Sequence, residues 1–316
     1  METLLIIGGT GSLGYNLVGR LLTEYKIVIV SRDENKQWQM KKLFPGLVYL
    51  LGDIRNKTHM ASLLLRIRPH KIILAAALKH IDICEQNIAE CIATNVIGVQ
   101  NVLDLVVEHS SQLEVNTVVF ISTDKATSPA NTYGMSKAIC ERMVAEKSLY
   151  VKSPRFLNVR YGNVLNSRGS LFPLFHEIGK DPTCEFFPLT SPEMTRFFMS
   201  LNDSIDLILT AIREGDSGDT FIPKTTSYRL LDIAERFSQR YSKPVKVIGM
   251  RPGEKLHESL ISDSECYRTV DKTTHYVIKP CYNVVVTEPI REYSSKDTVC
   301  CDKEQICRLV TQSEMP

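Results

Sequence analysis

Short apolar runs alternate with amphipathic segments through the first half of the chain. Six of these runs lack polar alternation, which predicts strands buried on both faces, and they lie at Leu4–Ile7, Lys26–Val30, Leu47–Leu51, Lys71–Ala75, Thr117–Ser122 and Arg155–Arg160. Apolar residues recur at helical spacing in four segments between them, at Ser12–Glu24, Lys57–Ile67, Glu85–His109 and Asn131–Tyr150. Repeated strand–helix units of this kind predict an α/β fold, a doubly wound parallel sheet of the Rossmann type.

The second half of the chain has a different pattern. Glycine and proline become frequent after about Asn163, and the regular succession of strands and helices ends. The elements expected here are helices within residues 197–215 and 227–241, strands at Thr220–Pro223 and Val245–Met250, and a helix that opens at "RPGEKLHESLI", residues 251–261.

This change of pattern predicts two domains with a cleft between them. Residues 1–165 form the first domain, and residues of about 197–224 are expected to return to it. Residues 166–316 mainly form a smaller C-terminal domain. No repeat or low-complexity linker separates the two, so we expect the second part to fold against the first.

Composition and charge narrow the class of protein. Of the 316 residues, 43% are hydrophobic and 23% are charged, and the formal net charge is only +2. That balance gives no general attraction to nucleic acid or to a membrane. We see no apolar stretch of the roughly 18–20 residues that span a bilayer and no basic region of a secretory signal at the start, so we expect a cytoplasmic protein. The nine cysteines are scattered and are expected to be free thiols, and no metal site is expected.

A glycine loop at the start of the chain predicts a dinucleotide site. "LLIIGGTGSLG" has glycines at positions 8, 11 and 14, directly after a predicted strand and before a predicted helix. Glycines allow the tight turn and a close approach of the backbone to a pyrophosphate, and the helix start offers free N–H groups. The alternative is a glycine-rich turn without a ligand. The cofactor-binding residues expected here are Gly8, Thr10, Gly11, Ser12, Leu13 and Gly14.

The end of the second predicted strand selects between NAD and NADP. An acidic residue there binds the ribose 2′-hydroxyl, whereas an arginine accommodates a 2′-phosphate. This chain has Ser31 and Arg32 at that point, with Asp33 one step later, and NADP is therefore the expected cofactor. The alternative is that Arg32 is a solvated residue at a helix start. "GDIR" after the third strand places Asp53 and Ile54 where the adenine edge is expected.

The stretch "STDKATSPANTYGMSK" (122–137) combines several reactive side chains. Tyr133 and Lys137 are four residues apart on a predicted helix and share a face. A nearby ammonium and the cofactor charge are expected to lower the pKa of the tyrosine, which makes it a base for a hydroxyl proton. Asp124 and Lys125 precede them. The other interpretation of that pair is a surface ion pair worth at most about 1 kcal/mol.

These motifs resemble the extended short-chain dehydrogenase/reductase superfamily over nearly the whole chain. "STDKA" is similar to the UDP-N-acetylglucosamine 4,6-dehydratases of that superfamily, whereas the deoxythymidine-diphosphate-glucose group carries Asp-Glu at the same place. Further stretches resemble the same group: "AAALKHIDICEQNIAECIATNVIG", "VRYGNVLNSRGSLFPLF", "LTSPEMTRFF" and "RPGEKLHESLI".

The resemblance implies a reaction and a role for each of five catalytic residues. Tyr133 removes the C4 hydroxyl proton, Thr123 hydrogen-bonds the same oxygen, and Lys137 holds the ribose and the tyrosine. Lys125 takes the C5 proton, and Asp124 protonates the C6 hydroxyl as it leaves. The chain resembles the shorter group that keeps the tyrosine and inverts C5. The implied product is UDP-2-acetamido-2,6-dideoxy-β-L-arabino-hexos-4-ulose.

The resemblance also implies the remaining ligand contacts. Arg196 and Arg251 would clamp the diphosphate, Glu254 would contact the nucleotide ribose, and Arg168 and Ser170 would lie near the uracil. Ala75, Ala76, Ala77 and Lys79 complete the expected cofactor site. The other expected residues for UDP-N-acetylglucosamine are Lys79, His80, Asn163, Thr190 and Met194.

Other functions stay open on the sequence. A UDP-sugar 4-epimerase or 4-reductase would share the cofactor and the Tyr–Lys pair, although simple C4 chemistry needs no acid for C6. The residues themselves do not separate N-acetylglucosamine from glucose, and a non-catalytic NADP-binding regulator is a more distant alternative. The resemblance implies a homo-oligomer, a dimer or a hexamer, formed through the helices at 85–109 and 131–150.

Overall fold

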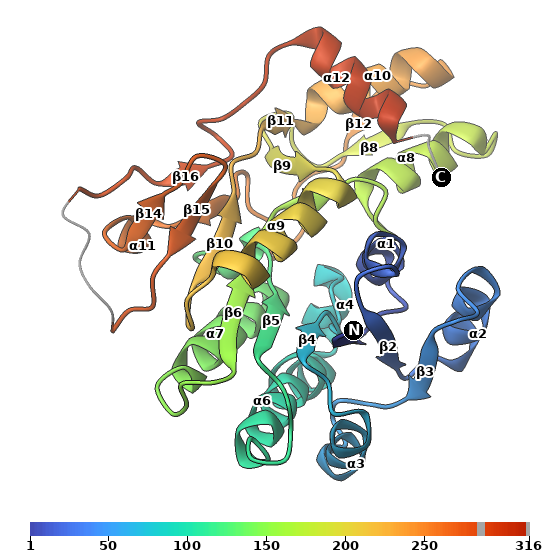
Figure 1. Ribbon diagram of the computed structural model, residues 1–316. Helices are drawn as coiled ribbons and strands as arrows, with labels where there is room; N and C mark the ends of the chain where they lie inside the picture. Colours follow the sequence, from blue (N-terminus) through green and yellow to red (C-terminus); the bar gives the residue numbers. More distant parts are fainter. Residues whose placement is uncertain (283–287, 314–316) are drawn as a thin grey trace.

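The computed structural model describes residues 1–282 and 288–313 and is built around one nine-stranded sheet (Figure 1). The strand order is β14-β15-β10-β6-β5-β4-β1-β2-β3. The strands are β1 (Thr3–Ile7), β2 (Lys26–Ser31), β3 (Val48–Leu51), β4 (Lys71–Leu74), β5 (Thr117–Ile121), β6 (Arg155–Val159), β10 (Thr220–Pro223), β14 (Thr269–Asp271) and β15 (His275–Ile278).

The six strands predicted from apolar runs are confirmed, and they pair in parallel. Strand β10, predicted at the same residues, adds to β6 in parallel. The sheet then continues with β15 and β14, which are antiparallel to their neighbours. These two strands come from the C-terminal part of the chain and were not expected from the sequence.

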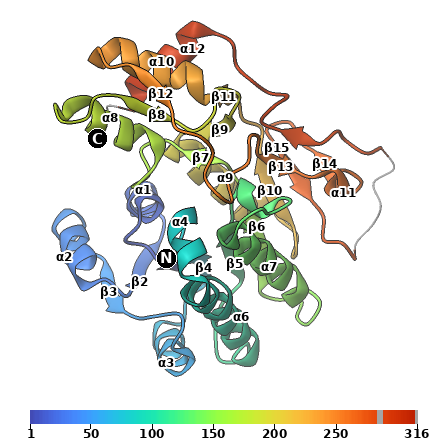
Figure 2. The ribbon, with the colours of Figure 1, turned by 180° about the vertical axis from the view of Figure 1, so that it is seen from behind.

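Helices cover both faces of the sheet, as a doubly wound fold requires. Figure 1 faces one side, with α1 (Ser12–Leu21) and α9 (Leu201–Glu214), and Met40 of α2 (Glu34–Leu43) joins the same apolar core. Figure 2 faces the other side, where the apolar core includes residues of α3 (Lys57–Ile67), α6 (Gly98–Glu108) and α7 (Thr132–Lys147). Helix α2 was missed because it buries only Gln37 and Met40 and so lacks an apolar stripe.

The predicted helix at 85–109 is assembled from several pieces. They are α4 (Ile81–Gln86), α5 (Ile88–Cys91), a π-helical turn at Ile92–Ile97 and α6. Within the described residues, the stretch Ile88–Glu108 is long and apolar enough to cross a membrane, with a mean hydropathy of 1.3. The expectation that the chain has no stretch of this length and hydropathy is therefore wrong. More than half of this stretch, 56%, is buried inside the protein, as in the core helix of a globular fold.

The rest of the chain forms a smaller unit beside the carboxyl ends of the parallel strands. Its centre is a cluster of aromatic side chains that includes Phe172, Phe187 and Phe237. Its elements are β7 (Asn163–Val164), α8 (Leu171–Lys180), β8 (Phe187–Leu189), β9 (Thr195–Met199), β11 (Ser227–Arg229), α10 (Leu230–Tyr241), β12 (Val245–Val247), β13 (Ser259–Ile261), α11 (Asp263–Cys266), β16 (Tyr293–Ser294) and α12 (Lys303–Gln312).

The prediction of a helix that begins at "RPGEKLHESLI" is wrong. Residues 251–258 contain turns and no helix, and residues 259–261 are strand β13. Gly253 has a φ of +80°, which a helix does not allow. The carbonyls of Gly253, Lys255 and Leu256, which would serve helical hydrogen bonds, accept instead from distant side chains.

Candidate active site

The catalytic turn, which we define as residues 122–131, joins β5 to α7. It contains a short 3-10 turn at Asp124–Ala126. Asn131 caps α7, since its Oδ1 accepts from the backbone N–H of Gly134 at 2.7 Å. A Cβ on Gly134 would lie 2.2 Å from the carbonyl oxygen of Lys125, so only glycine lets the helix start pack on the turn. This close packing brings Tyr133 against residues 123–125.

Tyr133 and Lys137 lie in this buried environment. Lys137 is 3% exposed and donates to the carbonyl oxygen of Ile121 at 2.7 Å. Burial lowers the pKa of Lys137 to about 8. Burial also raises the pKa of Tyr133, and a hydrogen bond with Thr123 opposes this only in part. The protein's own groups therefore do not lower the tyrosine pKa as expected from the sequence.

Asp124 and Lys125 form a buried ion pair, and the interpretation as a surface pair is wrong. Asp124 is 0% exposed, and its Oδ1 accepts from Thr123 Oγ1 at 2.9 Å and from Lys125 Nζ at 3.0 Å. Burial by itself lowers the pKa of Lys125, but the carboxylates of Asp124 and Glu258 outweigh it, and the pKa is raised. Lys125 therefore holds its proton more firmly than burial alone would allow.

A cavity of about 910 Å³ runs from the glycine loop past the catalytic turn to Arg251. Every residue expected in the site lines this cavity except Asp124, which lies behind Thr123 and Lys125. Thr94, Ser122 and Tyr161 also line it and were not expected. Within residues 1–282 and 288–313, no group of three or more His, Cys, Asp or Glu side chains could hold a metal ion.

The residues at one end of the cavity fit a dinucleotide. Gly8 has a φ of +84°, and a Cβ there would lie 2.5 Å from the backbone nitrogen of Ala76. Only glycine therefore lets the loop pack on the chain after β4, and the start of α1 beside it has no side-chain cap and can offer free N–H groups to a phosphate. Arg32 faces the same end, with Nη1 3.9 Å from Asp53 Oδ2. Lys36, one helical turn later, lines the cavity too and was not expected.

Arg168 connects the loop after β7 to the glycine loop. Its backbone N–H donates to Ser12 Oγ at 3.0 Å, and its Nη1 donates to the carbonyl oxygen of Thr10 at 3.2 Å. Lys79 Nζ in turn donates to the carbonyl oxygen of Arg168 at 2.5 Å. These contacts lie at the cofactor end of the cavity, and the expected contact of Arg168 with the uracil stays a prediction.

The opposite end of the cavity has polar groups for a sugar nucleotide. Ser170 Oγ is buried without a hydrogen bond in the described part of the chain, which leaves it available to a ligand. Arg196 is 6% exposed and donates to the carbonyl oxygens of Lys255 at 2.9 Å and Leu256 at 3.1 Å. The expected diphosphate clamp of Arg196 and Arg251 stays a prediction, and the structure adds that Arg196 also holds the backbone beside it.

Glu258 was missed, because the sequence reading placed it on a helix face. Its carboxylate is buried, and its Oε1 lies 3.7 Å from Lys125 Nζ. A period-two pattern could have revealed it. Leu256, Glu258 and Leu260 alternate as on one face of an extended segment, which would have placed an acidic residue among buried neighbours.

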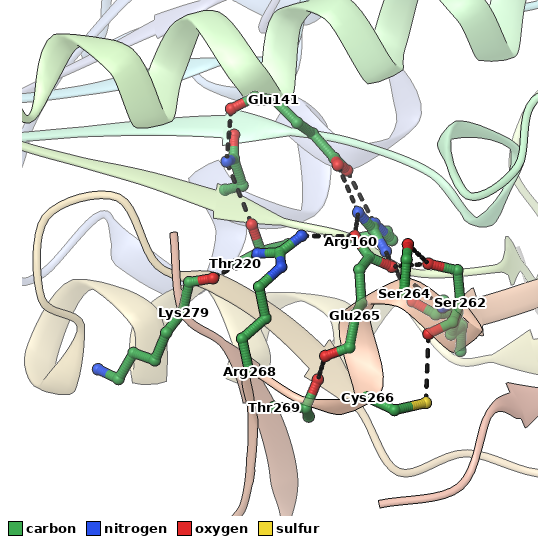
Figure 3. Close-up of polar contacts among 12 residues, drawn as sticks. Glu141, Arg160, Thr220, Ser262, Ser264, Glu265, Cys266, Arg268, Thr269 and Lys279 are labelled. Carbon is green, nitrogen blue, oxygen red and sulfur yellow. Dashed lines mark hydrogen bonds and ion pairs between the residues drawn. The ribbon is translucent and has the colours of Figure 1, made fainter. Parts of the chain in front are cut away.

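A buried arginine anchors the helix that carries Tyr133 and Lys137 (Figure 3). Arg160, directly after β6, makes paired hydrogen bonds to Glu141 of α7 and to Glu265 of α11, at 2.5–2.9 Å. Such two-point bonds fix direction as well as distance. Arg160 also donates to the carbonyl oxygen of Leu260 in β13 at 2.9 Å. The catalytic helix is thereby tied to the strand that follows Glu258.

A doubly wound sheet, a glycine loop after β1 and a Tyr–Lys pair on the helix after β5 together define the geometry of a sugar-nucleotide enzyme. The family model described as "Polysaccharide biosynthesis protein" matches residues 4–280, and the chain belongs to this family. An inverting UDP-N-acetylglucosamine 4,6-dehydratase of Campylobacter jejuni subsp. jejuni serotype O:2 is 38% identical over 88% of this chain and 83% of the relative. A UDP-glucose 4-epimerase of Rickettsia rickettsii is 37% identical over 88% and 82%.

Solved structures agree on the fold. Pen from Bacillus thuringiensis is similar over 99% of this chain and 98% of its own, with a TM-score of 0.89 and 31% identity. More distant structures with bound NAD, at 16–19% identity and TM-scores of 0.66–0.68, share the fold alone. A dinucleotide cofactor in this chain is supported by its own glycine loop, which lines the cavity.

Replacement of Lys137 should stabilise the cofactor-free protein at neutral pH. The folded pKa of about 8 lies below the unfolded value of roughly 10.4, so the folded protein holds this proton less firmly. The loss of stability from burying the charged Lys137 is therefore present in full below about pH 8, and it decreases as the pH rises toward roughly 10.4. We expect Lys137→Met to raise the free energy of unfolding by about 1–3 kcal/mol near neutral pH, and the gain to shrink at about pH 10. Denaturant titrations at both pH values measure this, and a Lys137→Met variant less stable than the wild type at both contradicts it.

Proposed function

We propose that the chain is a UDP-N-acetylglucosamine 4,6-dehydratase that uses NADP and inverts C5. The observation that carries the proposal is the buried Asp124–Lys125 pair beside Thr123 and Tyr133. Oxidation at C4 needs a base for the hydroxyl proton only, so a second acid–base pair indicates a second reaction on the same sugar. The relatives named as inverting dehydratases, at 37–38% identity, support this assignment.

In the first half of the proposed reaction, the protein removes the proton of the C4 hydroxyl. Tyr133 takes this proton, and Thr123 hydrogen-bonds the same oxygen. Lys137 lies one helical turn after Tyr133 and is buried behind it, where its ammonium can hold the cofactor ribose. A bound nicotinamide would supply the hydride acceptor for C4 and the hydride for C6, while C5 would take a proton from solvent.

In the second half, water leaves across C5 and C6. The ketone at C4 acidifies the C5–H bond, Lys125 takes that proton, and Asp124 protonates the departing C6 hydroxyl. Both steps need uncharged groups. The 3.0 Å hydrogen bond from Lys125 Nζ to Asp124 Oδ1 is a path by which one proton can pass from amine to carboxylate and produce both. Because Thr123 and Lys125 separate Asp124 from the cavity, this role requires side chains to move when the substrate binds.

A UDP-glucose 4-epimerase is the second candidate, because relatives from several Rickettsia species at 37–38% identity carry that name. An epimerase returns the hydride to C4 and releases no water. The mass of the product therefore separates the two functions. A dehydratase acting on UDP-glucose would perform the proposed chemistry on a different sugar. The rates of dehydration of UDP-glucose and UDP-N-acetylglucosamine by the same protein distinguish these two substrates.

The first test is incubation of the purified chain with NADP and UDP-N-acetylglucosamine. We expect a product lighter by one water in mass spectrometry. In D₂O, proton NMR should show deuterium at C5 and the L-arabino configuration. Tyr133→Phe is the matched control, because it removes only the phenolic oxygen and should give neither product nor reduced nicotinamide. An isomer of unchanged mass would favour the epimerase, and a product with the D-xylo configuration at early times would refute inversion.

We propose NADP rather than NAD because Ser31 ends β2, Arg32 follows it, and both line the cavity. Arg32→Ala should weaken NADP binding by at least about 1.5–3 kcal/mol, the worth of a hydrogen bond to a charged group, and should affect NAD much less. Lys41→Ala is the control, since it removes the same charge from the exposed end of α2. Calorimetric titration with both cofactors measures the effect, and equal losses for NADP and NAD would sink the assignment.

We propose that two copies of the chain associate through α5, the π-helical turn and α7, which contact one another. Five large apolar side chains on these elements are 44–51% exposed: Ile88, Ile92, Ile97, Met135 and Ile139. Exposed apolar clusters of this kind mark association surfaces. Ile92→Glu should give monomers in analytical ultracentrifugation, whereas Leu43→Glu, on distant α2, should leave the oligomer intact. A wild-type chain that sediments as a monomer contradicts the proposal, and a hexamer would extend it.

We also propose a cytoplasmic location. All nine cysteines lie among the described residues and are unpaired, which suits a reducing compartment.

A further inference from the structure

The segment 251–258 runs from the mouth of the cavity to the catalytic turn. Arg251 and Glu254 line the cavity, and the backbone N–H of Arg251 donates to Glu254 Oε2 at 3.1 Å. The segment ends at Glu258, whose side chain is 2% exposed and does not line the cavity. A carboxylate buried to this degree needs positive partners, because an unpaired buried charge is strongly destabilising.

Two ammonium groups supply those partners. Glu258 Oε1 lies 3.7 Å from Lys125 Nζ, and Oε2 lies 3.1 Å from Lys255 Nζ. Lys255 Nζ also donates to the carbonyl oxygen of Thr127, in the catalytic turn, at 2.9 Å. Glu258 therefore stands between Lys255, which has a structural contact, and Lys125, which has a proposed chemical role.

The carboxylate cannot easily follow Lys125 if that side chain moves. The backbone N–H of Glu258 donates to Ser295 Oγ at 2.9 Å. Asn131 Nδ2 donates to the carbonyl oxygen of Gly253 at 2.8 Å, and Arg196 holds two further carbonyls of the segment. These bonds come from both sides, so the position of Glu258 is set by the fold and not by Lys125.

We propose that Glu258 is a positioning residue for Lys125, which it holds at the cavity wall and whose charged form it favours when Lys125 takes the C5 proton. This inference rests on the dehydratase function proposed above. When Lys125 passes a proton to Asp124, one N–H bond breaks and one O–H bond forms, and both groups become neutral. Glu258 then remains as an anion beside a neutral amine. Uptake of the C5 proton by that amine restores an attractive pair, so Glu258 strengthens the base at the step that needs it.

The charges around Lys125 predict how a variant will behave. Burial lowers the pKa of Lys125, Asp124 and Glu258 raise it more, and Arg196 opposes them. The groups that act on this ammonium directly or through Glu258 are Asp124 in the turn, Arg196 on β9, and Lys255 and Glu258 in the segment 251–258. Removal of the Glu258 charge therefore lowers the pKa of Lys125 and makes it a weaker base.

The test compares Glu258→Gln with the wild type in D₂O, with UDP-N-acetylglucosamine and NADP. We expect C4 oxidation, read as formation of reduced nicotinamide, at nearly the wild-type rate. The exchange of C5–H with solvent should fall on the order of tenfold at its high-pH plateau, about 1.4 kcal/mol in barrier. The rise of exchange with pH should move to lower pH, because a weaker base loses its proton earlier.

Two further variants separate positioning from general damage. Glu258→Asp keeps the charge and should restore part of the exchange and the wild-type pH profile. Ser295→Ala loosens the same backbone without changing a charge, and should leave the pH profile where the wild type has it. A Glu258→Gln variant with an unmoved pH profile, or one that loses oxidation and exchange equally, overturns the proposal.

A second readout needs no substrate and so separates failure of this proposal from failure of the proposed function. The pH dependence of Lys125 labelling by an amine-reactive reagent can be followed by peptide mass spectrometry. It should move to lower pH in Glu258→Gln and stay in place in Ser295→Ala. A wild-type protein that dehydrates no UDP-N-acetylglucosamine contradicts the function, whereas unmoved labelling in Glu258→Gln contradicts the role of Glu258.

Discussion

The burial of one ammonium group between two carboxylates is the constraint on which the site depends. Lys125, Asp124 and Glu258 are each 14% exposed or less at the side chain, and none of these charges could be buried alone without a large loss of solvation. Their carriers come from the end of β5 and from a segment more than a hundred residues later. The chemistry is therefore available only where the sheet and the C-terminal part of the chain meet.

The same junction is held by a second buried charge cluster. Arg160 bonds to α7 through Glu141 and to the C-terminal part through Glu265 and Leu260. Burial and pairing act on Glu265 together: burial favours its neutral form, but Arg160 outweighs this and lowers the pKa of Glu265 to about 2. Strand β13 thus lies between two ionic contacts in the chain, with Glu258 just before it and Glu265 shortly after it. One short strand fixes the distance between the helix that carries Tyr133 and the residue that faces Lys125.

The sequence was a good guide where burial is uniform and a poor one where contacts are long-range. The six apolar runs and the glycine loop are local patterns, and the structure has them at the expected places. Helix α2 lacks an apolar stripe, β14 has only three residues, and the apolar part of β15 is limited to Tyr276, Val277 and Ile278. The site residues carried by motifs gather in one cavity, but Glu258 and Lys36 were missed because their importance depends on what the fold places opposite them. The pKa of Tyr133 is raised where the sequence predicted that it would be lowered. This error has the same cause, since the burial of a side chain depends on the folded chain.

The contacts of Arg168 bear on whether a bound coenzyme leaves the protein between catalytic cycles. The loop that carries this residue is bonded to the glycine loop through its own backbone and guanidinium, and Lys79 bonds to it in turn. A dinucleotide beneath it would have to break those bonds to escape, while the exposed Arg251 leaves the other mouth of the cavity more accessible. Such an arrangement suits a coenzyme that finishes each cycle in the oxidation state in which it began, and which can therefore serve many substrate molecules without being exchanged.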